Sequence, residues 1–173
     1  MKILIAGILS GLIVISANAQ SDSPLKELEQ LQGQWHGPSW YMTREGRSDS
    51  MVTENVRCQW DCELIIVEGK GQTTNEQGKP QTAHQALGVI HYDASAQQIM
   101  MRAYAQGRGA TDSPVEKIAN STYRWFLSLP HNSGQLRYTL DLSEENTWSE
   151  KGEFSRDGKQ WHQIMEMTLT KTK

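Results

Sequence analysis

The sequence predicts an all-β protein whose fold is an antiparallel up-and-down barrel of about 8–10 strands with a short N-terminal helix. Beyond residue 32 the chain contains about nine segments in which apolar and polar residues alternate, separated by turn-forming residues. No segment in this region has a convincing helical period. The pattern is typical of antiparallel barrels and sandwiches.

Residues 1–19 have the features of a signal peptide. Lys2 precedes an apolar stretch over residues 3–15, and Ala17-Asn18-Ala19 is a small-x-small cleavage site. Cleavage there would leave residues 20–173 as a single domain. The apolar stretch is short for a transmembrane helix and no later segment is apolar enough to span, so we expect no membrane anchor. The signal and the cysteines together predict a periplasmic or secreted protein.

The charge pattern argues against nucleic acid as a partner. The chain carries 17 basic and 20 acidic residues, with a formal net charge of −3 and no basic stripe. Its five histidines are not spaced as a metal-ligand set, and it has no phosphate-binding loop, Gly-x-Ser-x-Gly or His-Glu-x-x-His motif. We therefore expect no metal and no cofactor, while the oligomeric state stays open.

Two segments outside the strands are expected from their composition. Residues 23–32 predict a short helix, in which Ser23 can act as the cap, Pro24 suits the first position, and three leucines share a face. Residues 106–120 predict one long connection, which is either a plain surface loop or a lid over a cavity.

The four C-terminal segments predict hairpins that share one apolar face. A two-residue turn at Asp157-Gly158 would pair Glu150 with Met165 and Gly152 with Gln163. Loops at residues 143–147 and 130–135 extend the sheet backwards along the chain. The expected rows across the sheet are Trp125, Leu140, Glu150, Met165 and then Leu127, Tyr138, Gly152, Gln163.

These rows contain the candidate site. Glu150 and Gln163 lie among large apolar side chains, and Gly152 leaves a gap beside them. A buried carboxylate without a partner costs several kcal/mol, so Glu150 either has a partner across the barrel, lines a wet cavity, or touches water at the barrel mouth. The candidate ligand-binding residues are Glu150, Gln163, Tyr138, Trp125, Trp148 and Met165.

The two cysteines predict a structural disulfide. A hairpin with the three-residue loop 59–61 would place Cys58 opposite Cys62, within disulfide range. A redox centre would favour the Cys-x-x-Cys spacing, and a zinc site would need further ligands nearby, and the sequence has neither.

The hairpin over residues 84–105 carries a second hint of a cavity. A four-residue loop at 93–96 would place four small residues on one face, and the sequence leaves open whether that face points inward. They are Ala86, Gly88, Ala103 and Ala105.

The segment "LQGQWHG" resembles the Gly-x-Trp entrance of calycin-type barrels such as lipocalins, with Gly33 and Trp35 in the matching positions. "ALGVIHYD" and "SRDGKQW" are similar to segments of a bacterial secreted family of calycin-like barrels of unknown function (DUF1579). The resemblance implies that Trp35 packs at the closed end of a barrel, beneath the N-terminal helix. Lys171 is the nearest substitute for the arginine that often covers this tryptophan.

Three functions are compatible with these features. The leading hypothesis is a barrel that binds a small, largely apolar ligand in its interior. The second makes Glu150 the general acid or base of an enzyme acting on a small molecule, although no second catalytic group is identifiable. The third is a solid-core interaction module recognised through Trp40, Trp60 or residues 106–120.

Overall fold

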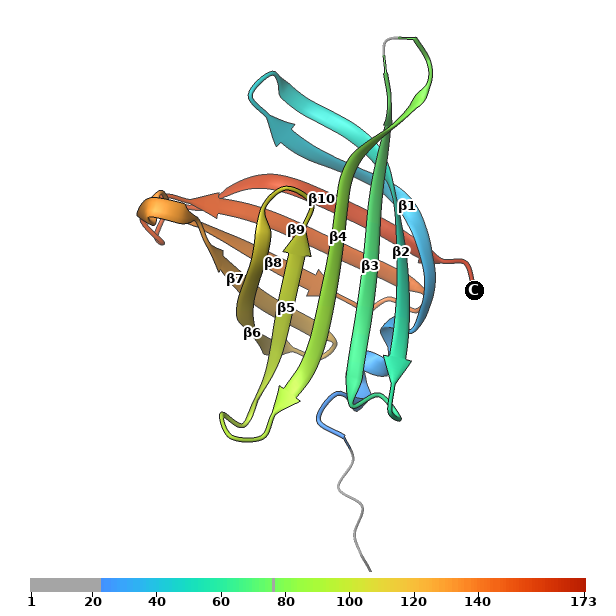
Figure 1. Cartoon of the computed structure of the whole chain (residues 1–173), viewed down its shortest axis with the longest axis vertical. Coiled ribbons are helices and arrows are strands. Elements are labelled where there is room, and N and C mark those ends of the chain that lie inside the picture. Colours follow the sequence, from blue (N-terminus) through green and yellow to red (C-terminus); the bar gives the residue numbers. More distant parts are fainter. Residues whose placement is uncertain (1–22, 76) are drawn as a thin grey trace, which may run out of the picture.

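The computed structural model describes residues 23–75 and 77–173, which form a closed barrel of ten antiparallel strands (Figure 1). Each strand pairs with its neighbours in sequence, and β10 closes the barrel against β1, which confirms the predicted fold class. The predicted signal peptide lies outside the described residues. The strands are β1 Gly33–Thr43, β2 Gly46–Gln59, β3 Leu64–Thr74, β4 Pro80–Asp93, β5 Gln98–Ala105, β6 Gly109–Ala119, β7 Thr122–Ser128, β8 Gln135–Asp141, β9 Thr147–Ser155 and β10 His162–Lys171.

A short helix covers one end of the barrel, as the N-terminal pattern predicts. It is the 3-10 helix η1, Lys26–Leu31, and the second 3-10 segment is η2, Pro130–Asn132. A 3-10 helix has three residues per turn, so leucines spaced by three fall on one side. Leu25, Leu28 and Leu31 are all buried. No helix in the described part of the chain has the length and hydropathy needed to cross a membrane.

Trp35 lies beneath η1, as the resemblance implies. Its side chain is 2% exposed, and its indole Nε1 donates a hydrogen bond of 2.7 Å to the Leu31 carbonyl. The Nζ atom of Lys171 lies 5.1 Å from the centre of the Trp35 ring and donates to the Gln30 carbonyl. Lys171 therefore takes the covering position expected of a basic residue and also ties β10 to the helix.

The barrel is filled near η1 and accessible at the opposite end. Inward side chains near the helix form one buried cluster that includes Val56, Ile65 and Leu169. Towards the other end, inward side chains such as Trp125, Tyr138 and Met165 are only partly buried. The β1–β2 and β3–β4 hairpins project from this second end, away from the blue N-terminal segment (Figure 1). We call the two parts the closed half and the open half.

Residues 106–120 do not form the long connection that their composition predicts. Residues 106–108 make a tight turn and residues 109–119 form β6, in which Ser113 and Val115 point inward and are buried. Pro114 lacks an N–H group and interrupts the regular ladder, which is why the segment does not look like a strand. The Ser113 hydroxyl compensates by accepting a hydrogen bond of 3.2 Å from the Phe126 backbone N–H.

The predicted strand registers are right for one hairpin and shifted by two residues in two others. The β8–β9 pairs Leu140–Glu150 and Tyr138–Gly152 are confirmed. In β9–β10 the partner of Glu150 is Met167, not Met165. The cause is a longer turn, because the Asp157 carboxylate accepts the backbone N–H groups of Lys159 and Gln160 and holds residues 156–161 outside the ladder.

The β7–β8 hairpin is shifted in the same way. Trp125 pairs with Tyr138, and Leu140 pairs with Tyr123 instead of Trp125. β7 ends at Ser128 and β8 begins at Gln135, each one residue earlier in the sequence than expected. The turn is closed by a hydrogen bond from the Leu129 N–H to the carbonyl of Gly134, and Gly134 has a φ of 140°. Both shifts are by an even number of residues, so every side chain except those near one bulge stays on its predicted face.

The cysteines form the predicted disulfide but not at opposite positions of a hairpin. Cys58 and Cys62 are bonded with a Cα–Cα distance of 4.6 Å, while the ladder partner of Cys58 is Ile65. The loop therefore spans residues 60–63, and its residues 60–62 all have positive φ. The disulfide clamps this turn at the closed end of the barrel.

The small-residue face of the β4–β5 hairpin points inward. Gly88 pairs with Ala103, and Ile90 pairs with Met101 on the same face, where both Ile90 and Met101 belong to the buried core. The opposite face, with Leu87 and Tyr104, is directed outward. Gly88 lies close to neighbouring core side chains, since a Cβ there would be 3.6 Å from Val67 Cβ and 3.9 Å from Met101 Sδ.

Candidate functional site

Glu150 lies at the base of the open half. It occupies the middle of β9, between Leu140 of β8 and Met167 of β10, and is 7% exposed. Its Oε2 atom accepts a hydrogen bond of 3.2 Å from the Trp148 indole Nε1. Trp148 in turn packs edge-on against Trp35, with ring centres 5.8 Å apart, so the donor belongs to the rigid closed half.

Two stacked aromatic rings line the interior above Glu150. Trp125 of β7 and Tyr138 of β8 are cross-strand partners whose ring centres are 5.6 Å apart, with an angle of 15° between their planes. The Tyr138 ring lies over Gly152, where a Cβ atom would be 3.0 Å from Tyr138 Cε1 and 3.2 Å from Met165 Cβ. Glycine at position 152 therefore makes room for the ring, and Met165 completes this wall.

Sequence reasoning missed a second interior acid, Glu54 of β2. Its ladder partner is Gly69 of β3, and a Cβ atom on that glycine would lie 2.6 and 2.7 Å from the two carboxylate oxygens of Glu54. The carboxylate therefore lies over the glycine, inside the barrel. The alternation of Val52, Glu54 and Val56 could have indicated an inward position, since both valines are buried.

Burial makes both interior acids harder to ionise. Burial raises the pKa of Glu54 to about 8, with a further contribution from the negative charge of Glu150. Burial also raises the pKa of Glu150 to about 7, and the hydrogen bond from Trp148 opposes this rise. Burial and the charge of Glu150 raise the pKa of Tyr138 to about 12. The interior therefore holds two carboxyl groups that titrate near neutral pH.

Basic groups lie at the rim and not beside these acids. Arg108 belongs to the β5–β6 turn at the open end and is exposed. Burial and the nearby charge of Arg108 both lower the pKa of His84, and Arg108 also opposes the rise in the pKa of Tyr138. The interior acids therefore lie deeper in the open half than Arg108, which lies at its rim.

Five of the six candidate ligand-binding residues lie together inside the barrel, and Gln163 does not. A bulge in the β9–β10 ladder between Gln163 and Met165 turns the Gln163 side chain outward. Its Nε2 atom donates to Glu166 Oε2 at 3.2 Å, and the side chain is exposed. Trp161 likewise packs on the outer face, against Phe126 and the guanidinium of Arg137.

Two open hollows border strands at the surface of the barrel. One, of about 720 Å³, is bordered by Trp40, Arg47 and Glu166 on β1, β2 and β10, and the Trp40 indole donates to Glu166 at 3.3 Å. The other, of about 460 Å³, includes Lys70 and Tyr104 on the outside of β3 and β5. Neither hollow contains Glu54 or Glu150.

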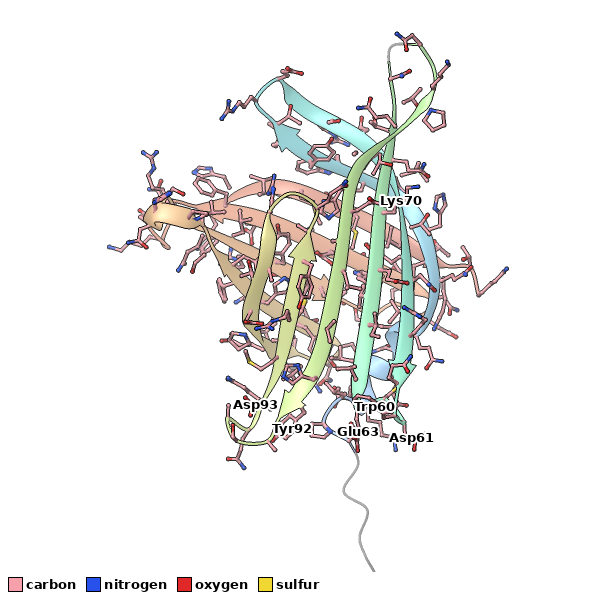
Figure 2. All side chains as sticks on the ribbon, viewed as in Figure 1. Trp60, Asp61, Glu63, Lys70, Tyr92 and Asp93 are labelled. Atoms are coloured by element: carbon pink, nitrogen blue, oxygen red, sulfur yellow. A yellow bond between two sulfur atoms is a disulfide. The ribbon has the colours of Figure 1, made fainter. Side chains whose placement is uncertain are left out.

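Trp60, the exposed tryptophan considered above as a recognition residue, is far from the open half. It is 73% exposed and projects with Asp61 and Glu63 from the β2–β3 turn, at the same end as Tyr92 and Asp93 (Figure 2). Within residues 23–75 and 77–173, no three His, Cys, Asp or Glu side chains gather in a way that could hold a metal ion.

Comparison with known proteins identifies the fold. No family model and no curated protein matches the chain. The structure is similar to the crystal structure of Rv2717c from M. tuberculosis, with a TM-score of 0.61 and 12% identity over 86% of this chain and 97% of that chain. It is also similar to the S-type phycobiliprotein lyase CPES from Guillardia theta, with a TM-score of 0.58 and 7% identity over 87% and 93% of the two chains. The fold is a calycin-like barrel. Identities this low show the fold alone.

Proposed function

We propose that this protein is a periplasmic or secreted barrel that binds a small, largely apolar ligand in the open half of its interior. The observation that carries the proposal is the partial exposure of the inward side chains Trp125, Tyr138 and Met165. Inward side chains of a filled barrel would be buried, as they are in the closed half. Binding sites for small molecules are typically apolar with a few fixed polar groups, which Glu150 and Glu54 supply here.

The location outside the cytoplasm is supported by the disulfide between Cys58 and Cys62 and by the signal-like residues 1–19. Membership of the bacterial secreted family that the sequence resembles is supported by Trp35 beneath η1 and by Lys171 over its ring. The similarity to a phycobiliprotein lyase is compatible with a binding role for the barrel, and it transfers no ligand to this chain.

Native mass spectrometry of protein purified from its own host tests the proposal directly, because a retained ligand reports its mass. Binding of the neutral fluorescent dye Nile red provides a second measurement. We expect the dye to bind and Trp125→Ala to weaken its binding, since that ring lines the interior. Trp40→Ala is the matched control, because Trp40 lies on the outer face. Equal loss in both variants, or no dye binding at all, would contradict an interior site.

A second candidate function is an enzyme, and Glu54 is the observation that favours it. The enzyme hypothesis needs a second catalytic group, and Glu54 is the candidate, because burial and the negative charge of Glu150 both raise its pKa. Two carboxyl groups that titrate at different pH values can act as an acid and base pair. Incubating a ligand identified by mass spectrometry with wild type and Glu150→Gln would decide, since only wild type should form product.

A further inference from the structure

The acids inside the barrel lack the partners that other acids of this chain have. The pKa of Glu27 is lowered by hydrogen bonds from Lys117 and Tyr123, and that of Glu153 by a hydrogen bond from Arg137. Inside the barrel, Trp148 Nε1 is the one donor to either acid among the described residues. No described basic side chain pairs with Glu54 or Glu150.

The free carboxylate oxygens face accessible space. Among the described residues, Arg124 Nε is the only fully inaccessible side-chain nitrogen or oxygen without a hydrogen-bond partner. Oε1 of Glu150 and both oxygens of Glu54 also have no hydrogen-bond partner, but they are not among the fully inaccessible atoms. They therefore retain contact with the space inside the open half. Glu150 is 7% exposed, and its Oε1 atom is a hydrogen-bond acceptor without a donor. This atom faces the same space that the rings of Trp125 and Tyr138 line.

A ligand cation would complete this arrangement. Burying two carboxyl groups without a counter-charge is unfavourable, and an ammonium group supplies three donors and a positive charge. The stacked rings of Trp125 and Tyr138 offer an apolar and electron-rich surface, which suits the carbon skeleton next to such a group. Arg108 is exposed in the β5–β6 turn at the rim, where solvent screens its charge.

We propose that the ligand is a hydrophobic amine, whose ammonium group binds between the Glu54 and Glu150 carboxylates while its apolar body packs against Trp125, Tyr138 and Met165. This inference rests on the proposed function and specifies the ligand class for the same site. It assigns Glu54 and Glu150 as the specificity-determining residues of the barrel.

Isothermal titration calorimetry with three probes of one skeleton tests the inference. The probes are 1-naphthylmethylamine, 1-naphthalenemethanol and 1-naphthoic acid, which are cationic, neutral and anionic at neutral pH. We expect the amine to bind at least about 10-fold more tightly than the alcohol, and the acid to bind most weakly. Glu54→Gln and Glu150→Gln should each reduce the amine preference and leave the affinity for the alcohol unchanged. Glu145→Gln, an exposed loop residue, is the matched control.

Proton release gives an independent measurement on the unmodified protein. Binding an ammonium group should ionise the two carboxyl groups, so the amine should release between one and two protons at pH 7, measured from titrations in buffers of different ionisation heat. The alcohol should release none.

The outcomes separate the two proposals. Equal affinity for the amine and the alcohol, or tightest binding of the acid, would overturn the amine inference and leave the interior binding site intact. Failure of all three probes and of Nile red to bind would overturn the proposed function itself. An amine preference that survives in the double variant Glu54→Gln/Glu150→Gln would show that the acids do not determine it.

Discussion

Glu150 should make the folded protein less stable as the pH rises through neutrality. The folded state holds the Glu150 proton to about pH 7, whereas the unfolded chain releases it near the ordinary value of 4.5. Between these values the folded state binds more protons than the unfolded state, so the free energy of unfolding falls with increasing pH. Its contribution is fully present below the unfolded pKa and is lost as the pH rises through the folded pKa.

The size of this effect follows from the two pKa values. A rise from 4.5 to about 7 corresponds to roughly 3 kcal/mol over the whole titration. Most of this falls between pH 5 and pH 8. Glu54, with a pKa of about 8, also makes the free energy of unfolding fall as the pH rises. Replacing Glu150 with Gln keeps an oxygen acceptor for Trp148 Nε1, removes its titration, and relieves the repulsion that raises the pKa of Glu54.

Urea unfolding at pH 5, 6, 7 and 8, followed by circular dichroism, measures this dependence. Wild type should lose stability across the series, Glu150→Gln should lose clearly less, and Glu54→Gln/Glu150→Gln should no longer lose stability, because the lowered pKa of His84 acts in the opposite direction. Glu145→Gln should follow wild type, because its side chain is exposed in the β8–β9 loop. A wild-type curve that is flat or rises with pH, or a Glu150→Gln slope equal to wild type, would refute the buried position of this carboxyl group.

Three further changes test the structure around the site. Trp35→Ala should reduce the free energy of unfolding by about 3–5 kcal/mol in urea titrations, as expected for a buried aromatic side chain, and a change below about 1 kcal/mol would contradict its packing under η1. Loss of the disulfide in Cys58→Ser/Cys62→Ser should cost about 2 kcal/mol, because the loop it closes is short, and should leave Nile red binding unchanged. Gly37→Ala should lower the thermal midpoint by several degrees, since the new Cβ would overlap the Thr168 carbonyl on β10; an unchanged midpoint would contradict this close strand contact.

The alternation in the sequence was sufficient to place most of the candidate site inside the barrel. Side chains on a strand alternate between two faces, so an error of two residues in register preserves the face of every residue. For this reason the sequence predicts the interior position of four site residues correctly, although the strand partners it predicts in two hairpins are wrong. The four are Glu150, Tyr138, Trp125 and Met165. The prediction is wrong at β6, because Pro114 and several small polar residues make this strand resemble a loop in the sequence.

The turns were harder to predict because side chains, and not the backbone pattern alone, decide their length. Asp157-Gly158 is typical of a two-residue turn, yet the Asp157 carboxylate captures two backbone N–H groups and extends the loop. The bulge that accommodates this loop also turned Gln163 outward, because one extra residue reverses the side-chain direction.

By itself the sequence determined the all-β class, the apolar faces of the strands, the buried tryptophan near the N-terminal helix and the inward direction of Glu150. The all-β class, the apolar faces and the direction of Glu150 follow from the two-residue period of a strand, whereas the buried tryptophan followed from the resemblance to calycin-type barrels. Tertiary structure alone decided that Glu54 of β2 faces the same interior as Glu150 of β9. Nothing local to either strand specifies that meeting, because it depends on closure of the barrel between β1 and β10, where residues distant in sequence first come together.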